Sequence, residues 1–276
     1  MRPYPVRGGV AVVTGAASGI GRALGVELAA RGSHLALIDR DAAGLEAVTS
    51  ELRARHPDVR VSAHLFDLAH PDSIADLTDA VLRAQRRVTL LINNAGVALG
   101  GHFTELTLEE FEWVMSVNFR AVVAMTGAFL PALRCSLDAH VVNVSSVFGL
   151  VAPAGQSAYA ASKYAVRGFS EALRHELAPR GVGVTVVHPG GIRTAIARNA
   201  RTASGTDPAQ AERGRREIEK VLRMDPAQAA RTILNAAERR QGRVLVGHDA
   251  ALLDVVARLL PGRYWQVLGP LFERGS

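Results

Sequence analysis

Short runs rich in β-branched residues alternate with longer amphipathic runs along almost the whole chain. The run 10–14 comes first, and it is followed by 20–30, in which Ile20, Leu24 and Leu28 recur at helical spacing. Strands joined by helices form right-handed βαβ units, which build a parallel sheet covered on both faces. The sequence therefore predicts an α/β fold, a doubly wound parallel sheet of about seven strands. The strands are expected at 10–14, 34–38, 59–65, 88–92, 140–144, 182–187 and 243–246, and the helices at 20–30, 42–55, 73–85, 107–134, 157–178 and 227–238.

The chain is long and apolar enough for one large domain. Its 276 residues are 48% hydrophobic, which suits a substantial buried core and argues against disorder. No internal repeat or linker divides the chain, so residues 1–276 are expected to form a single domain. The least periodic stretch is 199–214, which contains Ser204, Gly205 and the pair Asp207-Pro208. We expect a mobile loop there.

Composition narrows the classes of function. The N-terminal residues 1–8 lack the apolar core of a signal peptide, and no window reaches the ~18 uninterrupted apolar residues of a spanning helix. A cytoplasmic location is therefore expected. The single cysteine, Cys135, excludes a disulfide framework and a Cys-based zinc cluster, and no metal site is expected. The net charge of +6 comes from scattered arginines, which is typical of a solvated surface, so no nucleic-acid partner is expected.

A glycine-rich loop joins the first expected strand to the first helix. Phosphate binding needs a tight turn, a close approach of the backbone and a helix N-terminus aimed at the anion. Gly15 permits the turn, and Gly19 and Gly21 remove side chains where a pyrophosphate and the helix must fit. The spacing is G-x-x-x-G-x-G. This loop, with Ser18 and Ile20, predicts a dinucleotide site of the Rossmann kind.

Asp39 ends the second expected strand, 18 residues after Gly21. A carboxylate at this place accepts hydrogen bonds from ribose hydroxyls and repels a 2′-phosphate, which favours NAD. The neighbouring Arg40 could instead contact a 2′-phosphate, so NADP stays open. Asp39 could also cap the next helix, a role that Asp41 can fill.

Ser146, Tyr159 and Lys163 are the candidate catalytic residues. Tyr159 and Lys163 are four apart on an expected helix and share a face. A free tyrosine has a pKa near ~10, about 3 units above the working pH of a general acid/base, a gap of roughly 4 kcal/mol. A lysine ammonium beside the phenol, together with a positive nicotinamide ring, favours the phenolate. Ser146, in the loop after the fifth strand, is placed to hold a substrate oxygen.

Together these motifs resemble the short-chain dehydrogenase/reductase family in its compact single-domain form, over roughly Gly9 to Val246. Asp67-Leu68 matches the pair that contacts adenine in the family, and Asn118 matches its fourth catalytic residue. The serine motif of the family is matched at Ser146, 13 residues before Tyr159. Further matches to the family's cofactor contacts are Asn94, Ala95, Gly96, Pro189, Gly190, Ile192 and Thr194.

The resemblance implies a mechanism. Tyr159 donates or accepts the substrate proton, and Ser146 polarises the carbonyl or orients the alcohol. Lys163 lowers the pKa of Tyr159 and binds the nicotinamide ribose. Asn118 holds a water in a proton relay to Lys163. The implied activity is that of an NAD(P)-dependent alcohol dehydrogenase or ketone reductase.

Apolar residues around Ser146 suggest a neutral, hydrophobic secondary alcohol or ketone, although the same side chains could pack the core. We expect substrate contacts from Val147, Phe148, Phe103 and Gln156, besides Ser146. Arg193 is expected to face solvent rather than bind a substrate anion. Residues 195–224 match the family's variable substrate lid, whose shape selects substrates.

The segment 248–276 departs from the compact family form. It contains an apolar helix followed by a tail with Tyr264 and Trp265. Three roles are open: packing against a second subunit, capping the cleft, or lying on a membrane with Arg258, Arg263 and Arg274 at its edge. A homodimer or homotetramer is the family's usual state, and it would bury this tail.

Two other functions compete with this one. A non-catalytic NAD(P)-binding sensor or scaffold would have no physical need for Asn118, Ser146, Tyr159 and Lys163 together. A sugar-nucleotide epimerase or dehydratase of the extended family form is disfavoured by the glycine spacing and the short C-terminal region.

Overall fold

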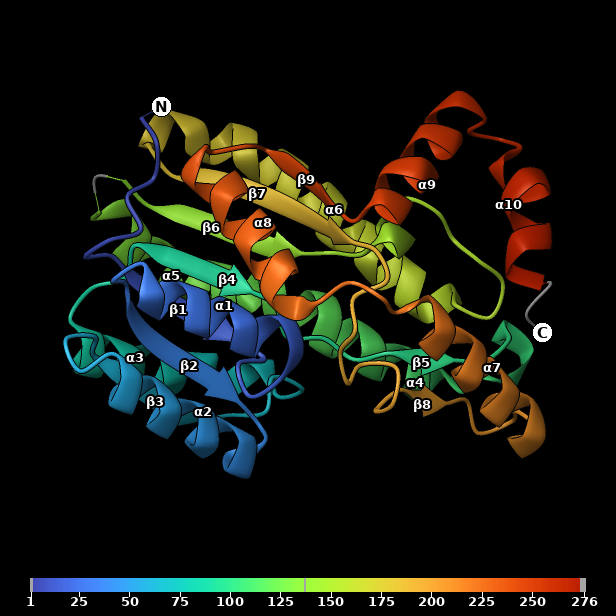
Figure 1. The fold of residues 1–276 in the computed structure, drawn as a ribbon, viewed down its shortest axis with the longest axis horizontal. Helices are drawn as coiled ribbons and strands as arrows, with labels where there is room; N and C mark the ends of the chain where they lie inside the picture. The colour runs from blue at the N-terminus through green and yellow to red at the C-terminus, as the bar shows by residue number, and fades with distance from the viewer. Residues whose placement is uncertain (1, 137, 274–276) are drawn as a thin grey trace.

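A sheet of seven parallel strands forms the centre of the computed structural model, which describes residues 2–136 and 138–273 (Figure 1). Its order is β3 (Val61–Leu65), β2 (His34–Asp39), β1 (Val10–Thr14), β4 (Leu90–Asn93), β6 (His140–Val144), β7 (Gly183–Pro189) and β9 (Arg243–Val246). The predicted doubly wound fold is confirmed. The order reverses between β1 and β4, and a crevice is expected at the carboxyl ends of these two strands.

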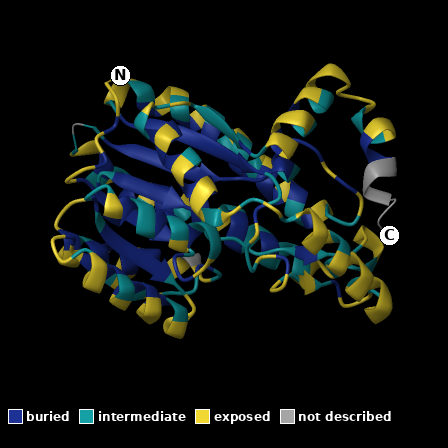
Figure 2. Cartoon of the chain, in the orientation of Figure 1, coloured by how far each residue is buried: buried dark blue, intermediate teal, exposed yellow. Residues whose placement is uncertain are grey.

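Helices cover both faces of the sheet. On one face lie α1 (Gly19–Ala30), α2 (Ala42–Arg55) and α8 (Pro226–Glu238), and on the other α3 (Ile74–Gln85), α5 (Ala121–Arg134) and α6 (Ser157–Leu177). Leu24 and Ile233 belong to the first apolar layer, and Met125 and Phe129 to the second. Figure 2 shows the strands as an almost continuous buried layer between these helices.

The long helix expected over 107–134 is present but not uniform. Thr107 caps α4 (Leu108–Met115) in a capping box with Glu110. A π-helical turn, η3 (Ser116–Arg120), then separates α4 from α5. The expected helical stretch is therefore confirmed, and the π-helical turn within it was not predicted, because sequence periodicity does not reveal a single extra residue in a helix.

The same stretch, Leu108–Arg134, is the one described helix that is long and apolar enough to cross a membrane by length and composition. This stretch was not identified from the sequence, because polar residues interrupt its apolar run. Its residues Met125, Phe129 and Leu133 are almost fully buried against the sheet. This is the behaviour of a core helix.

The loop expected over 199–214 contains regular structure. Strand β8 (Arg201–Thr202) pairs with β5 (Leu99–Gly100), and α7 (Pro208–Val221) begins inside the expected loop. The Asp207-Pro208 pair was interpreted as a loop signal. It is a helix start, because the Asp207 carboxylate accepts hydrogen bonds from the amides of Ala209 and Gln210 and proline fits the first helical turn.

Two helices follow the last strand and extend beyond the sheet at the upper right of Figure 1. They are α9 (His248–Leu259) and α10 (Tyr264–Glu273). Arg274, one of the arginines expected at a membrane edge, lies outside the described residues. The remaining short elements are η1 (Pro71–Ser73), η2 (Phe103–Glu105), η4 (Val147–Gly149) and η5 (Ala178–Arg180).

Candidate active site

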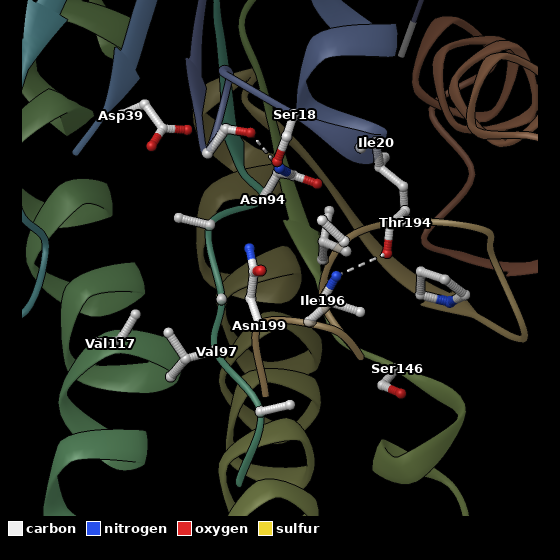
Figure 3. Close-up of a pocket in the computed structure, with 18 of the residues that line it drawn as sticks. Ser18, Ile20, Asp39, Asn94, Val97, Val117, Ser146, Thr194, Ile196 and Asn199 are labelled. Atoms are coloured by element: carbon white, nitrogen blue, oxygen red, sulfur yellow. Dashed lines mark hydrogen bonds between the residues drawn. The ribbon is translucent and has the colours of Figure 1, made fainter. Parts of the chain in front are cut away.

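A cleft of about 380 Å³ lies at the carboxyl edge of the sheet, where the strand order reverses (Figure 3). In that view Asp39 and Ser146 lie at opposite sides of it. The cleft is lined by all but one of the residues predicted to bind the cofactor: Gly15, Ser18, Gly19, Ile20, Asp39, Arg40, Asp67, Leu68, Asn94, Ala95, Gly96, Tyr159, Lys163, Pro189, Gly190, Ile192 and Thr194. The remaining one, Gly21, packs behind the loop.

The loop between β1 and α1 presents its backbone to the cleft. Gly15 has a φ of +66°, which L side chains rarely adopt. A Cβ on Gly21 would overlap the Gly15 carbonyl oxygen, so only glycine lets the helix approach this turn. Asn94 Nδ2 donates to the carbonyl oxygens of Thr14 at 2.9 Å and of Gly15 at 3.3 Å, which fixes the turn. Ser18 makes no side-chain cap hydrogen bond, so the first amides of α1 stay available for an anion.

Asp39 is held in place by backbone amides. Its two carboxylate oxygens accept hydrogen bonds from Ala17 N at 2.9 Å and from Asp41 N at 3.0 Å. Asp41 caps α2 by accepting from Gly44 N at 3.1 Å, so the capping role open to Asp39 belongs to its neighbour. The exposed Arg40 also lines the cleft.

Tyr159 and Lys163 meet Ser146 at the end of the cleft away from Asp39. Lys163 Nζ lies 5.6 Å from the centre of the Tyr159 ring and donates to the Val144 carbonyl oxygen at 3.2 Å. Burial lowers the pKa of Lys163 to about 8, because it disfavours the ammonium form. Burial raises the pKa of Tyr159, and a hydrogen bond with Ser146 opposes this.

Asn118 lies on the π-helical turn η3, and its side chain is hydrogen-bonded to Val97, in the loop between β4 and β5, and to Ser162 of α6. Its Oδ1 accepts from Val97 N at 2.8 Å, and its Nδ2 donates to Val97 O and to Ser162 Oγ, both at 3.0 Å. A Cβ on Gly96 would lie 3.2 Å from Asn118 Oδ1 and 3.3 Å from Lys163 Nζ. These two polar atoms therefore face the same space beside Gly96.

Four residues predicted to contact substrate do not line the cleft in the described structure. Phe103 is 71% exposed on η2, and Val147 is buried at the start of η4. Phe148 packs edge-on against the Tyr159 ring, with centres 6.1 Å apart, and Gln156 precedes α6.

The cleft has lining residues that sequence reasoning missed. Ile196, Asn199 and Leu222 come from the segment expected to be the lid, and Val97 and Val117 come from the opposite wall. Only their position in the expected lid, 195–224, could have suggested Ile196, Asn199 and Leu222 from the sequence. Arg193, in contrast, is exposed as expected, and it pairs with Asp225 at 3.3 Å.

The lid is fastened to the body beyond the cleft. The Arg201 guanidinium lies 3.9 Å from the centre of a Trp113 ring. Ala203 N donates to Gly100 O at 2.8 Å, and Ser204 N donates to Glu110 Oε1 at 3.0 Å. These contacts hold the middle of the lid against the segment 98–113.

Known proteins resemble this chain over most of its length. The sequence model of the family described as short chain dehydrogenase matches residues 9–205. A Mycobacterium tuberculosis protein named "Putative oxidoreductase SadH" is 43% identical over 95% of this chain and 94% of its own length. The "Dehydrogenase/reductase SDR family member 7B" of Bos taurus is 36% identical over 97% of this chain and 82% of its own length.

Solved structures share the fold. A short chain dehydrogenase/reductase from Burkholderia phymatum, in complex with NAD, has a TM-score of 0.85 and 30% identity, covering 94% of this chain and 95% of its own. A short-chain dehydrogenase from Sphingobium yanoikuyae, in complex with NADPH, has a TM-score of 0.76 and 31% identity, covering 92% and 94%.

Proposed function

This chain belongs to the short-chain dehydrogenase/reductase family of oxidoreductases, and we propose that it moves a hydride between a nicotinamide cofactor and a secondary alcohol or ketone, with Tyr159 as general acid/base. One observation carries the proposal. Ser146 and Asp39 lie at opposite sides of one cleft (Figure 3), and Tyr159 and Lys163 line the same cleft, with Lys163 Nζ 5.6 Å from the centre of the Tyr159 ring.

The residues of the cleft fit a dinucleotide. The uncapped first turn of α1 offers amides for a pyrophosphate, and Asp39 offers carboxylate oxygens for ribose hydroxyls. When bound, the cofactor supplies the hydride acceptor or donor and a ring charge that favours the Tyr159 phenolate. Lys163 is the candidate partner of the nicotinamide ribose.

The protein's own groups move the proton. In reduction the Tyr159 phenol donates its proton to the carbonyl oxygen of the substrate, and in oxidation the phenolate accepts the hydroxyl proton. The Ser146 hydroxyl orients that oxygen. Asn118 Oδ1 and Lys163 Nζ flank the same space beside Gly96, and one water there would extend the path of the proton.

We propose NAD as the preferred cofactor and NADP as the alternative. Asp39 is held toward the cleft by two amides, and its charge disfavours a 2′-phosphate. The NAD complex of the Burkholderia relative supports this choice, whereas the NADPH complex of the Sphingobium relative supports the alternative. Arg40 is the residue that would favour NADP.

The proposed substrate is neutral and hydrophobic. The walls of the cleft include Val97, Ile196 and Leu222, and the described cationic side chains that line it are Lys163 and, beside Asp39, Arg40. Burying apolar substrate surface against such walls contributes roughly 25 cal/mol per Å². A long or branched apolar alcohol is the expected class.

A turnover assay separates this function from its rival, a non-catalytic NAD(P)-binding sensor. Purified protein is incubated with NAD or NADP and a panel of secondary alcohols, and the absorbance of reduced nicotinamide is followed. We expect turnover with an apolar alcohol and faster turnover with NAD. Cofactor binding without turnover across the panel and the matching ketones would favour the sensor.

A further inference from the structure

The first turn of α9 touches the loop that follows β7. Asp249 Oδ2 accepts a hydrogen bond from Gly191 N at 2.6 Å. A Cβ on Gly190 would overlap the Asp249 carboxylate, so loop and helix are in close contact. Gly190 and Ile192 of this loop line the cleft. A carboxylate in the first turn of a helix is also stabilised by the helix dipole.

A second carboxylate of α9 reaches into the protein. Asp254, which is 8% exposed, binds both terminal nitrogens of Arg243 on β9, and Arg258 lies 3.3 Å from its Oδ2. The pair between Asp254 and Arg243 is mostly buried. Removing one partner of such a pair leaves an uncompensated charge, which is strongly destabilising locally.

His188 lies on the strand that pairs with β9, which carries Arg243, and it contacts the backbone of Ser146. It is fully buried on β7, next to β9 in the sheet, and its Nδ1 lies 2.9 Å from the Ser146 carbonyl oxygen. Because a carbonyl oxygen only accepts, Nδ1 carries the proton. Burial lowers the pKa of His188 to about 4, and the charges of Arg243 and Asp254 act on it. The imidazole is therefore a neutral donor that fixes the backbone of Ser146.

We propose that α9 is a brace for the active site: Asp249 positions the loop 190–194, and the Asp254–Arg243 pair fixes α9 to β9, the strand paired with β7, whose His188 positions Ser146. These are positioning residues, since none of them touches reacting atoms. The proposal rests on the function proposed above and gives the segment after β9 a role inside its own chain. Its two arms act on different steps, cofactor binding for Asp249 and the orientation of Ser146 for His188.

The first arm is tested by titrating NADH and NADPH into the full-length protein and following nicotinamide fluorescence. Asp249→Ala is expected to weaken binding about fivefold, the effect of losing one exposed charge-assisted hydrogen bond. Asp249→Asn keeps an acceptor oxygen and should stay within about twofold of wild type. The control is Asp76→Ala, which removes an exposed carboxylate from the first turn of α3. If Asp249→Ala binds both nucleotides as tightly as the control, the first arm is wrong.

The second arm is tested by kinetics with the best alcohol of the panel. His188→Val is expected to lower kcat about tenfold with little change in NADH affinity, because the donor to Ser146 is gone. His188→Asn should recover most of the loss, since its amide N–H can take the place of Nδ1–H. A wild-type kcat in His188→Val would overturn this arm. If that variant does not fold, Asp254→Asn is used instead, and it too must lower kcat.

The outcomes separate the two proposals. A wild-type protein without turnover contradicts the proposed function, but the nucleotide titrations still test Asp249. An active wild type whose Asp249 and His188 variants are unchanged contradicts the brace alone.

Discussion

Lys163 Nζ lies 5.6 Å from the centre of the Tyr159 ring, one turn further along α6. Burial raises the pKa of Tyr159, and the Ser146 side chain, just beyond β6, opposes the effect. A substrate oxygen placed between the Tyr159 phenol and the Ser146 hydroxyl would contact both.

Tyr159→Phe should lower turnover by roughly 10²–10⁴-fold, because it removes the group that transfers the proton. The affinity for the cofactor should stay within about twofold, since the phenyl ring keeps its place in the wall. Stopped-flow turnover and fluorescence titration measure the two effects. Tyr164→Phe is the matched control, because Tyr164 lies on the same helix and is 38% exposed. Substantial turnover in Tyr159→Phe would refute the assignment.

The two directions of the reaction should respond to pH in opposite ways. Burial raises the pKa of Tyr159, so the neutral phenol, the form that reduces a ketone, dominates at neutral pH. Alcohol oxidation needs the phenolate, so its kcat/KM should rise with pH, up to about tenfold per unit. Reduction should weaken as Lys163 loses its proton above a pKa of about 8. Initial rates in both directions over a pH series test this. An oxidation rate that is independent of pH would contradict it.

Asp39→Ala should shift cofactor preference toward NADP. Loss of the carboxylate removes both the ribose acceptor and the repulsion of a 2′-phosphate, which leaves Arg40 to attract it. We expect kcat/KM for NAD to fall about tenfold, equivalent to roughly 1.4 kcal/mol. Asp207→Ala, which removes the cap of α7 and does not line the cleft, should cost about 1 kcal/mol of stability without changing the preference. An unchanged NAD to NADP ratio in Asp39→Ala would count against the ribose contact.

Acid should destabilise the protein through His140. Burial lowers the pKa of this side chain to about 3, and it is hydrogen-bonded to Thr185 Oγ1 at 2.8 Å. The unfolded chain takes up the proton near a pKa of ~6.5, so stability is complete above that pH and falls toward pH ~3 by up to about 1.4 kcal/mol per unit. Urea unfolding at a series of pH values should show that the free energy of unfolding falls less steeply with acid in His140→Gln than in wild type. The exposed His248→Gln serves as the control, and an equal acid loss in His140→Gln would exclude His140 as the cause.

Local spacing was enough to predict the parts of the site that depend on one element. Tyr159 and Lys163 share a face of α6 because four residues make about one helical turn. The Gly15–Gly21 loop was predictable because a glycine pattern between a strand and a helix has few structural solutions. The sheet followed from the alternation of the two periodicities.

Contacts between distant segments were not predictable in this way. Asn199 lines the cleft two residues before β8, which pairs with β5. A strand of two residues is too short to show a periodic pattern in the sequence. The hydrogen bond from Gly191 to Asp249 joins residues that are 58 positions apart. The helix α7 was not predicted because an Asp-Pro pair is found both in loops and at the start of a helix, and here it begins a helix.

The π-helical turn at Ser116–Arg120 sets how the side chains before it and after it are rotated about the axis of one long helix. Within the turn, the Asn118 side chain accepts a hydrogen bond from Val97 N. After the turn, Met125 and Phe129 pack in the apolar layer against the sheet. Deleting one residue from the turn would let a regular α-helix run through, rotating one half against the other by about 100°. The core and the Asn118 contact could then not both be kept, so the extra residue is what lets a buried core helix also serve the active site.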